Sequence, residues 1–110
     1  MEFPYPVNVE EISIDRTVRL ILITSYLYYK LDISVMSDEN FDALCKKLSA
    51  HLEDNNLRLT DLGIAGATWL DVDDLKAGSG YAIDFNHPHF PARVTASAMT
   101  MASELGLLED

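Results

Sequence analysis

The sequence predicts a mainly α, compact domain of three long helices, with an irregular segment between residues 55 and 90. Apolar residues recur at steps of three and four in three stretches, which is the spacing of a helix face. Residues that favour helix starts precede these stretches, and most of the glycines fall between the second and the third. At 110 residues with 48% hydrophobic residues, the chain is expected to form one domain, residues 1–110, around one core.

The first helix is expected to be the central element of the domain. Asn8 and Glu11 have the spacing of a capping pair, so the helix should run from about residue 9 or 15 to about residue 30. It carries two apolar stripes: Val18, Ile21, Leu22, Ser25 and Tyr29 in one, and Leu20, Ile23 and Leu27 in the other. A helix that is apolar on most of its circumference is normally buried on most of it. We therefore expect other elements to cover it on two sides.

The second helix should form an antiparallel hairpin with the first, over about residues 9–54. Ser37 is a good N-cap, and Asp38 and Glu39 follow it in the first turn, where the helix dipole favours negative charge. From residue 38 to about 54 one apolar face is expected, with Phe41, Leu44, Cys45, Leu48 and Leu52. The link between the two helices is only a few residues long, which favours packing as neighbours.

The segment 55–90 gives weaker signals. We expect a short helix or turn near 60–68 and another at 72–77, capped by Asp71 and ended by Gly78. Residues 81–85 could form a short strand, as in a β-hairpin, or an extended crossover, and 86–91 should be a loop. Pro91 suits the start of a final helix over 91–107, which is the best candidate to cover the second side of the first helix.

Composition and charge exclude several classes of protein. The 18 acidic residues outnumber the 8 basic ones, for a net charge of −10, and the basic residues are scattered, so direct binding to nucleic acid is not expected. No apolar run reaches the length of a membrane span, no export signal is evident, and Cys45 is the one cysteine; these features favour the cytoplasm. The acidic charge serves either solubility or a surface for a basic or DNA-binding protein partner.

The stretch YLYYKLDISVMSDENFDAL, residues 26–44, resembles the helical domain at the N-terminus of NAD-dependent DNA ligases. The resemblance covers about residues 12–54. In that family the domain folds over the nicotinamide mononucleotide half of NAD, holds the nicotinamide between aromatic rings and binds polar groups with acidic side chains. The resemblance implies cofactor contacts at five positions: Tyr28, Asp38 and Asp42 keep the residue type of the family, whereas Tyr29 stands in place of a histidine and Phe41 in place of a tyrosine.

A purely structural interpretation of the same corner stays open. Asp38 suits the helix dipole, Asp42 stands four residues before Lys46 in a favourable pair, and Phe41 could be core. Tyr28 and Tyr29 could simply pack at a helix end with their hydroxyls in water.

Other candidate sites carry less specific patterns, and no metal site is expected. Asp84, His87 and His89 have a spacing that could offer ligands to zinc, but no cysteine or further histidine stands near them to complete the set. Asp71, Asp73 and Asp74 lack the glycine and distal glutamate of a calcium loop, and the GSG at 78–80 is typical of a turn. Cys45 lies on an apolar helix face, where a thiol is usually inert.

Two functions are expected. The first is a non-enzymatic acidic accessory protein that binds a macromolecular partner on a ligase-like helical scaffold, of a kind that suits phage or other mobile-element genomes. The second is a small nucleotide-binding protein that retains affinity for nicotinamide mononucleotide or NAD. Ligation is not expected, because KLDI at 30–33 lacks the glycine of the K-x-D-G motif of ligases and 110 residues leave no room for an adenylation domain.

Overall fold

A buried central helix organises the structure, a computed structural model that describes residues 8–64, 66–78 and 83–107. This helix, α1, spans Ile14–Leu31. It begins where Ser13 accepts a hydrogen bond from the backbone N–H of Arg16 at 3.1 Å, which satisfies an otherwise free donor of the first turn. Asn8 accepts from the backbone N–H of Glu10 and caps a separate turn, so the helix starts near the second of the two expected positions.

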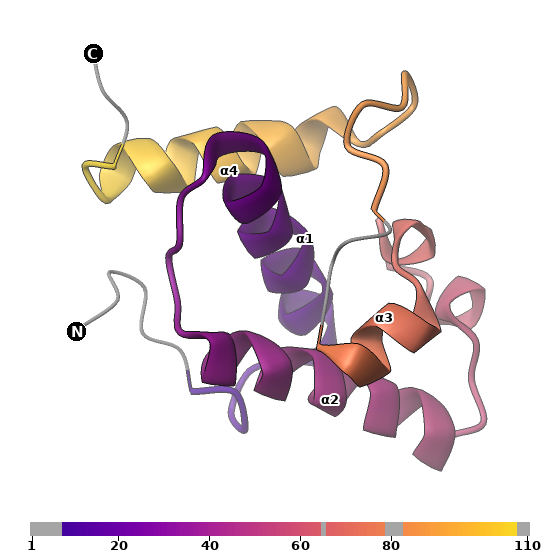
Figure 1. Cartoon of the computed structure of the whole chain (residues 1–110). Helices are drawn as coiled ribbons and strands as arrows, with labels where there is room; N and C mark the ends of the chain where they lie inside the picture. The colour runs from indigo at the N-terminus through magenta and orange to yellow at the C-terminus, as the bar shows by residue number, and fades with distance from the viewer. Residues whose placement is uncertain (1–7, 65, 79–82, 108–110) are drawn as a thin grey trace.

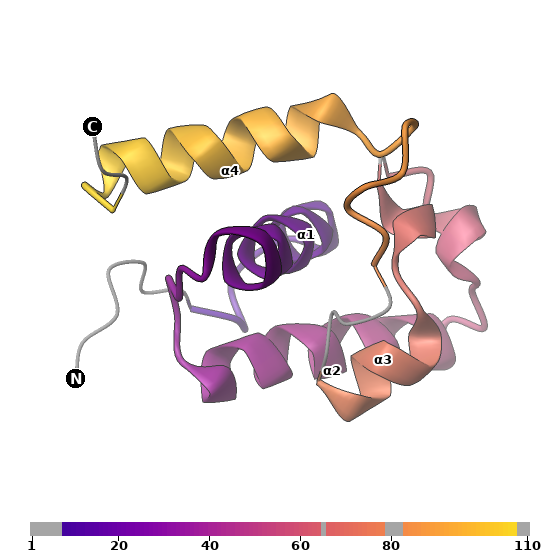
Figure 2. The same cartoon turned by 45° about the horizontal axis from the view of Figure 1, so that its top comes forward.

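The expected burial of α1 on two sides is confirmed. Nine of its residues are buried: Thr17, Val18, Leu20, Ile21, Leu22, Ile23, Thr24, Ser25 and Leu27. In both views α1 lies between α2 (Asp38–Asp54) and α4 (Ala92–Glu104), which run in opposite directions (Figures 1 and 2). One apolar cluster fills the side of α1 toward α2, and a smaller one, with Ile23 and Leu27 of α1, fills the side toward α4.

The helix α2 has the bounds that the sequence predicts. Ser37 accepts a hydrogen bond from the backbone N–H of Asn40 at 3.1 Å, and Asp38 and Glu39 lie in the first turn. Leu44, Cys45 and Leu48 are fully buried against α1 and the neighbouring elements. The predicted helical hairpin is therefore present, with α1 and α2 joined by residues 32–37.

Short elements occupy the segment after α2, as predicted. Two turns of 3-10 helix, η1 (Leu59–Leu62) and η2 (Ala67–Trp69), precede α3 (Val72–Ala77), which packs on α2. Asp71 caps α3 by accepting from the backbone N–H of Asp74, and Gly78 ends it at a φ of 71°. Residues 83–85 form no strand, and the other residues of the possible strand, 81 and 82, lie outside the described residues.

The helix α4 covers the second side of α1, although it ends at Glu104 and not at about 107. Gly106 adopts a left-handed φ of 72°, and the backbone N–H of Leu107 donates to the carbonyl of Ala102 at 2.8 Å. This geometry terminates a helix, because it turns the chain back over its last carbonyls. Among the described residues, no helix combines the length and apolar character needed to cross a membrane.

Small residues let α4 approach α1 closely, which gives a first prediction. Ala98 and Ala102 are fully buried in the cluster between the two helices. Ala102→Leu should lower the free energy of unfolding by about 1–3 kcal/mol, because overpacking a filled interface forces neighbours out of place. Urea unfolding followed by circular dichroism measures the change. The exposed Ala50→Leu on α2 is the control and should change it by less than about 0.5 kcal/mol; equal effects at both positions would contradict close packing.

Candidate functional site

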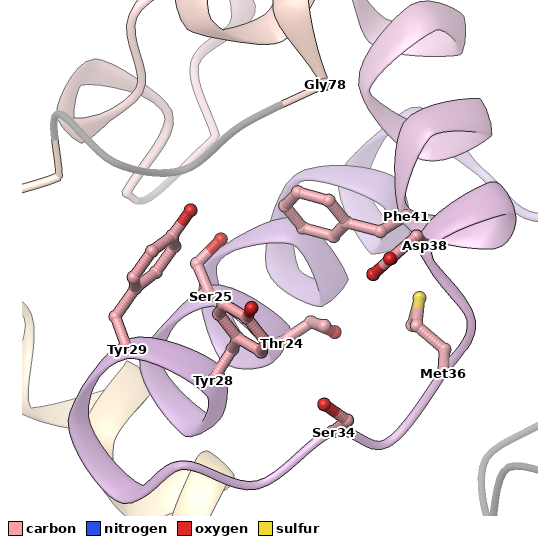
Figure 3. A pocket seen from close by; sticks show the side chains of 9 residues that line it. All are labelled: Thr24, Ser25, Tyr28, Tyr29, Ser34, Met36, Asp38, Phe41 and Gly78. Carbon is pink, nitrogen blue, oxygen red and sulfur yellow. The ribbon is translucent and has the colours of Figure 1, made fainter.

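A cavity of about 150 Å³ lies where the end of α1, the link 32–37 and the first turn of α2 meet (Figure 3). Helix geometry explains why these side chains meet there. Positions four apart lie on one face of a helix, so Thr24 with Tyr28, and Ser25 with Tyr29, project from α1 toward the same corner. The residues that line the cavity are Thr24, Ser25, Tyr28, Tyr29, Ser34, Met36, Asp38, Phe41 and Gly78.

Two buried hydroxyls form the floor of the cavity. Thr24 is 6% exposed and Ser25 is 1% exposed, yet neither hydroxyl has a hydrogen-bond partner among the described residues. In Figure 3 the Ser25 hydroxyl points toward the space between Tyr29 and Phe41, and the Thr24 hydroxyl points toward the side of Met36 and Asp38. Buried polar groups are normally satisfied, so an open pair that faces a cavity indicates a place for a polar ligand group.

The hydroxyl of Thr17 shows the usual arrangement on the same helix. Thr17 is fully buried, and its hydroxyl donates to the backbone carbonyl of Ser13 at 2.8 Å, four residues earlier. Serine and threonine inside helices commonly make this bond. Thr24 and Ser25 do not make it, although both residues line the cavity.

Exposed aromatic rings form the rim. Tyr28 is 51% exposed and Tyr29 is 42% exposed, and their rings meet edge to face with centroids 5.0 Å apart. Tyr29 also stacks on Phe85, with centroids 6.4 Å apart and planes inclined by 28°. Because Phe85 supports one ring from outside the hairpin, the segment before α4 helps to shape the rim.

Four of the five predicted site residues line the cavity, and the fifth does not. Tyr28, Tyr29, Asp38 and Phe41 are lining residues. Asp42 instead forms an ion pair with Lys46, with 2.8 Å between Oδ2 and Nζ, and this bond raises the pKa of the Lys46 ammonium. Asp42 also packs so closely against Gly78 that a Cβ on that residue would collide with it.

The electrostatic environment of the cavity is acidic. Among the described residues, Asp38 is the charged side chain that lines it. Two lysines close in sequence to the cavity residues have other partners: Lys46 pairs with Asp42, and Lys30 donates to the side-chain oxygen of Asn86 at 2.6 Å. The cavity thus offers hydroxyls and a carboxylate, without a cation to neutralise an anionic ligand.

The remaining candidates form local structure. His87 accepts from the backbone N–H of His89 through Nδ1 at 3.0 Å, and Asp84 accepts from the backbone N–H of Asn86 at 3.1 Å. No three acidic, histidine or cysteine residues of the described ranges are grouped to hold a metal ion. Residues 79 and 80 of the GSG turn lie outside those ranges.

The thiol of Cys45 is fully buried on the apolar face of α2. Burial, followed by the negative charges of Asp42 and Asp74, raises its pKa from the ordinary value of 9.0 to about 12. The thiol is therefore protonated at neutral pH, and it is not an effective nucleophile there because the thiolate is the reactive form.

The quoted motif, residues 26–44, does not reveal the floor of the cavity, because Thr24 and Ser25 precede it. A usable signal exists nonetheless: Thr24 and Ser25 interrupt the apolar run LILITSYLYY inside a helix that must be buried. In comparisons with protein-family models, curated proteins and solved structures, nothing matches the chain. The resemblance to the ligase domain stays a prediction.

The two threonines of α1 give a matched test of the floor. Thr24→Val should raise the free energy of unfolding of the ligand-free protein by about 1 kcal/mol, because it removes a buried hydroxyl that has no partner. Thr17→Val should lower it by about 1 kcal/mol, since it removes a hydroxyl that is bonded. Urea unfolding of both variants provides the measurement. Destabilisation of the same size in both would show that the Thr24 hydroxyl is satisfied in the native state.

Proposed function

We propose that this protein is a non-enzymatic binding protein and that the corner cavity is its ligand site. The observation that carries the proposal is the pair of buried, unpartnered hydroxyls of Thr24 and Ser25, which face a cavity bounded by aromatic rings. Leaving such groups without partners costs about 1–3 kcal/mol each, and a bound polar group would offset that cost.

The size of the cavity supports a ligand with one ring. A volume of about 150 Å³ is similar to that of protein cavities that take up benzene, and it is smaller than the roughly 300–1,000 Å³ of sites for drug-sized molecules. One aromatic ring with a small substituent would fill it. Larger parts of a ligand would have to lie outside, over Tyr28 and Tyr29.

The resemblance of residues 26–44 to the ligase domain suggests which ring this is. Nicotinamide is a single ring with a carboxamide, and the family holds it between aromatic rings and binds polar groups with acidic side chains. Tyr28, Tyr29, Asp38 and Phe41 meet at the cavity and could do the same here. We accordingly propose a ligand that contains nicotinamide, with the free base, nicotinamide mononucleotide and NAD as the first candidates.

A titration of these three compounds tests the proposal. At a hundred times its dissociation constant, a ligand that binds only the native state stabilises it by about 2.7 kcal/mol, which should raise the melting temperature by about 10 °C. Tyr28→Ala and Asp38→Asn should abolish the shift, because they remove a lining ring and the lining carboxylate.

Asp42→Asn is the matched control, since its carboxylate pairs with Lys46 and does not line the cavity. It should keep the shift. If none of the three compounds at millimolar concentration moves the melting temperature, the ligand site is refuted.

The charge distribution supports a second proposal, that the protein also acts as an accessory to a basic or DNA-binding protein in the cytoplasm. Within the described residues, Arg19, Lys46, Arg58 and Lys76 pair with carboxylates of the chain itself, and acidic groups remain in large excess, for a net charge of −10. Glu39 and Asp73 are exposed in the first turns of α2 and α3. A basic surface would find these two exposed carboxylates there.

Salt dependence tests this second proposal. Affinity capture from cell extract at about 0.05 M salt should recover a basic protein, and about 0.5 M salt should release it, because screening shortens the range of surface charges. The double variant Glu39→Gln, Asp73→Asn should capture less of it. Recovery that is indifferent to salt and to these substitutions would argue against an electrostatic partner surface.

A further inference from the structure

We infer that the hydroxyls of Thr24 and Ser25 select the ligand, and that they select a one-ring carboxamide that carries no negative charge. This inference rests on the proposed ligand site and narrows its chemistry. It assigns a role to two residues of the cavity floor, and it separates uncharged or cationic ligands from those that carry a carboxylate or a phosphate.

Hydrogen-bonding capacity favours a carboxamide at the floor. Each hydroxyl can donate one hydrogen bond and can also accept, and neither bonds to another of the residues that the structure describes. A carboxamide carries an acceptor oxygen and a donor NH₂ group on one carbon, so it could bind either hydroxyl, whether that hydroxyl donates or accepts. A hydrocarbon ring of the same size would leave both without partners and would bind less well.

Charge disfavours an acid in the same place. The floor is at least nine-tenths buried at both hydroxyls, and no lysine or arginine of the described residues lines the cavity. A carboxylate on the ring would therefore lose its hydration without gaining a cation. It would also approach Asp38, the charged residue of the lining, which has the same sign.

The residues at the rim of the cavity also disfavour negative charge on the rest of the ligand. A ring attached to a phosphate would hold the dianion outside the small cavity, near Asp38 and the acidic first turn of α2. The nearby ammonium groups of Lys30 and Lys46 already bind Asn86 and Asp42. A positively charged ring, in contrast, would be attracted by Asp38 and by the faces of Tyr28 and Tyr29.

Two pairs of compounds test the selection in the wild-type protein, with dissociation constants measured by calorimetry or by NMR titration. Nicotinamide and nicotinic acid share a ring and differ in amide against carboxylate; nicotinamide should bind at least tenfold tighter. Nicotinamide riboside and nicotinamide mononucleotide differ by the phosphate. The riboside should bind tighter at low salt, and the difference should shrink as salt screens the repulsion.

Variants of the floor assign the effect to its residues. Thr24→Val and Ser25→Ala should each weaken nicotinamide binding at least tenfold, while Thr17→Val, whose hydroxyl is bonded within α1, should leave binding unchanged. Because Thr24→Val should melt at a higher temperature than the wild type, its loss of binding cannot be assigned to unfolding.

The outcomes separate this inference from the function on which it rests. Equal affinity for amide and acid, or unchanged affinity in both floor variants, would overturn the selection and leave the ligand site standing. Absence of binding by all four compounds would overturn the ligand site and the selection with it.

Discussion

The structure depends on the burial of α1 on two sides. Nine of its residues are buried, so α2 must cover one side of the helix and α4 the other, as Figures 1 and 2 show. After the link 32–37, α2 begins at its N-cap Ser37 and runs back along α1. Alanines on α4 allow close contact on the opposite side. The segment between α2 and α4 can be irregular, because it connects the helix on one side of α1 to the helix on the other side.

The candidate site lies where the packing of the other elements against α1 is incomplete. Toward its C-terminal end α1 carries Thr24 and Ser25 where the rest of its buried surface is mostly apolar, and the link to α2 passes by without filling the space beside them. The same helix therefore supplies both the core of the fold and the polar floor of a cavity. The exposed tyrosines one turn later form its rim, and the first turn of α2 adds a carboxylate. A packing constraint and the proposed binding surface meet on one helix, so a ligand bound there would also stabilise the hairpin.

Local sequence signals predict the helices well and the cavity only in part. Capping by Ser37 and Asp71 and the stop at Gly78 are decided within a few residues, so they can be read from the chain. The end of α4 is less predictable, because Leu105 continues the apolar spacing while Gly106 already favours a left-handed turn. Asp42 illustrates a different limit: the resemblance implies a ligand contact for it, whereas its contact with Gly78 depends on how α3 packs on α2. Its pair with Lys46 lies within α2 and can be predicted from the spacing of four residues. Whether a hydroxyl lacks a partner also depends on tertiary packing, and no spacing rule contains that information.

The most direct measurement is the detection of NMR contacts between nicotinamide and the floor of the cavity. Intermolecular nuclear Overhauser effects depend on proximity, so they report position independently of affinity or stability. Bound nicotinamide should show effects from its ring protons to the methyl groups of Thr24 and Met36, which lie deeper than the exposed tyrosines. Effects confined to the rings of Tyr28 and Tyr29, or the absence of any effect at saturating nicotinamide, would contradict a ligand site built on the hydroxyls of α1.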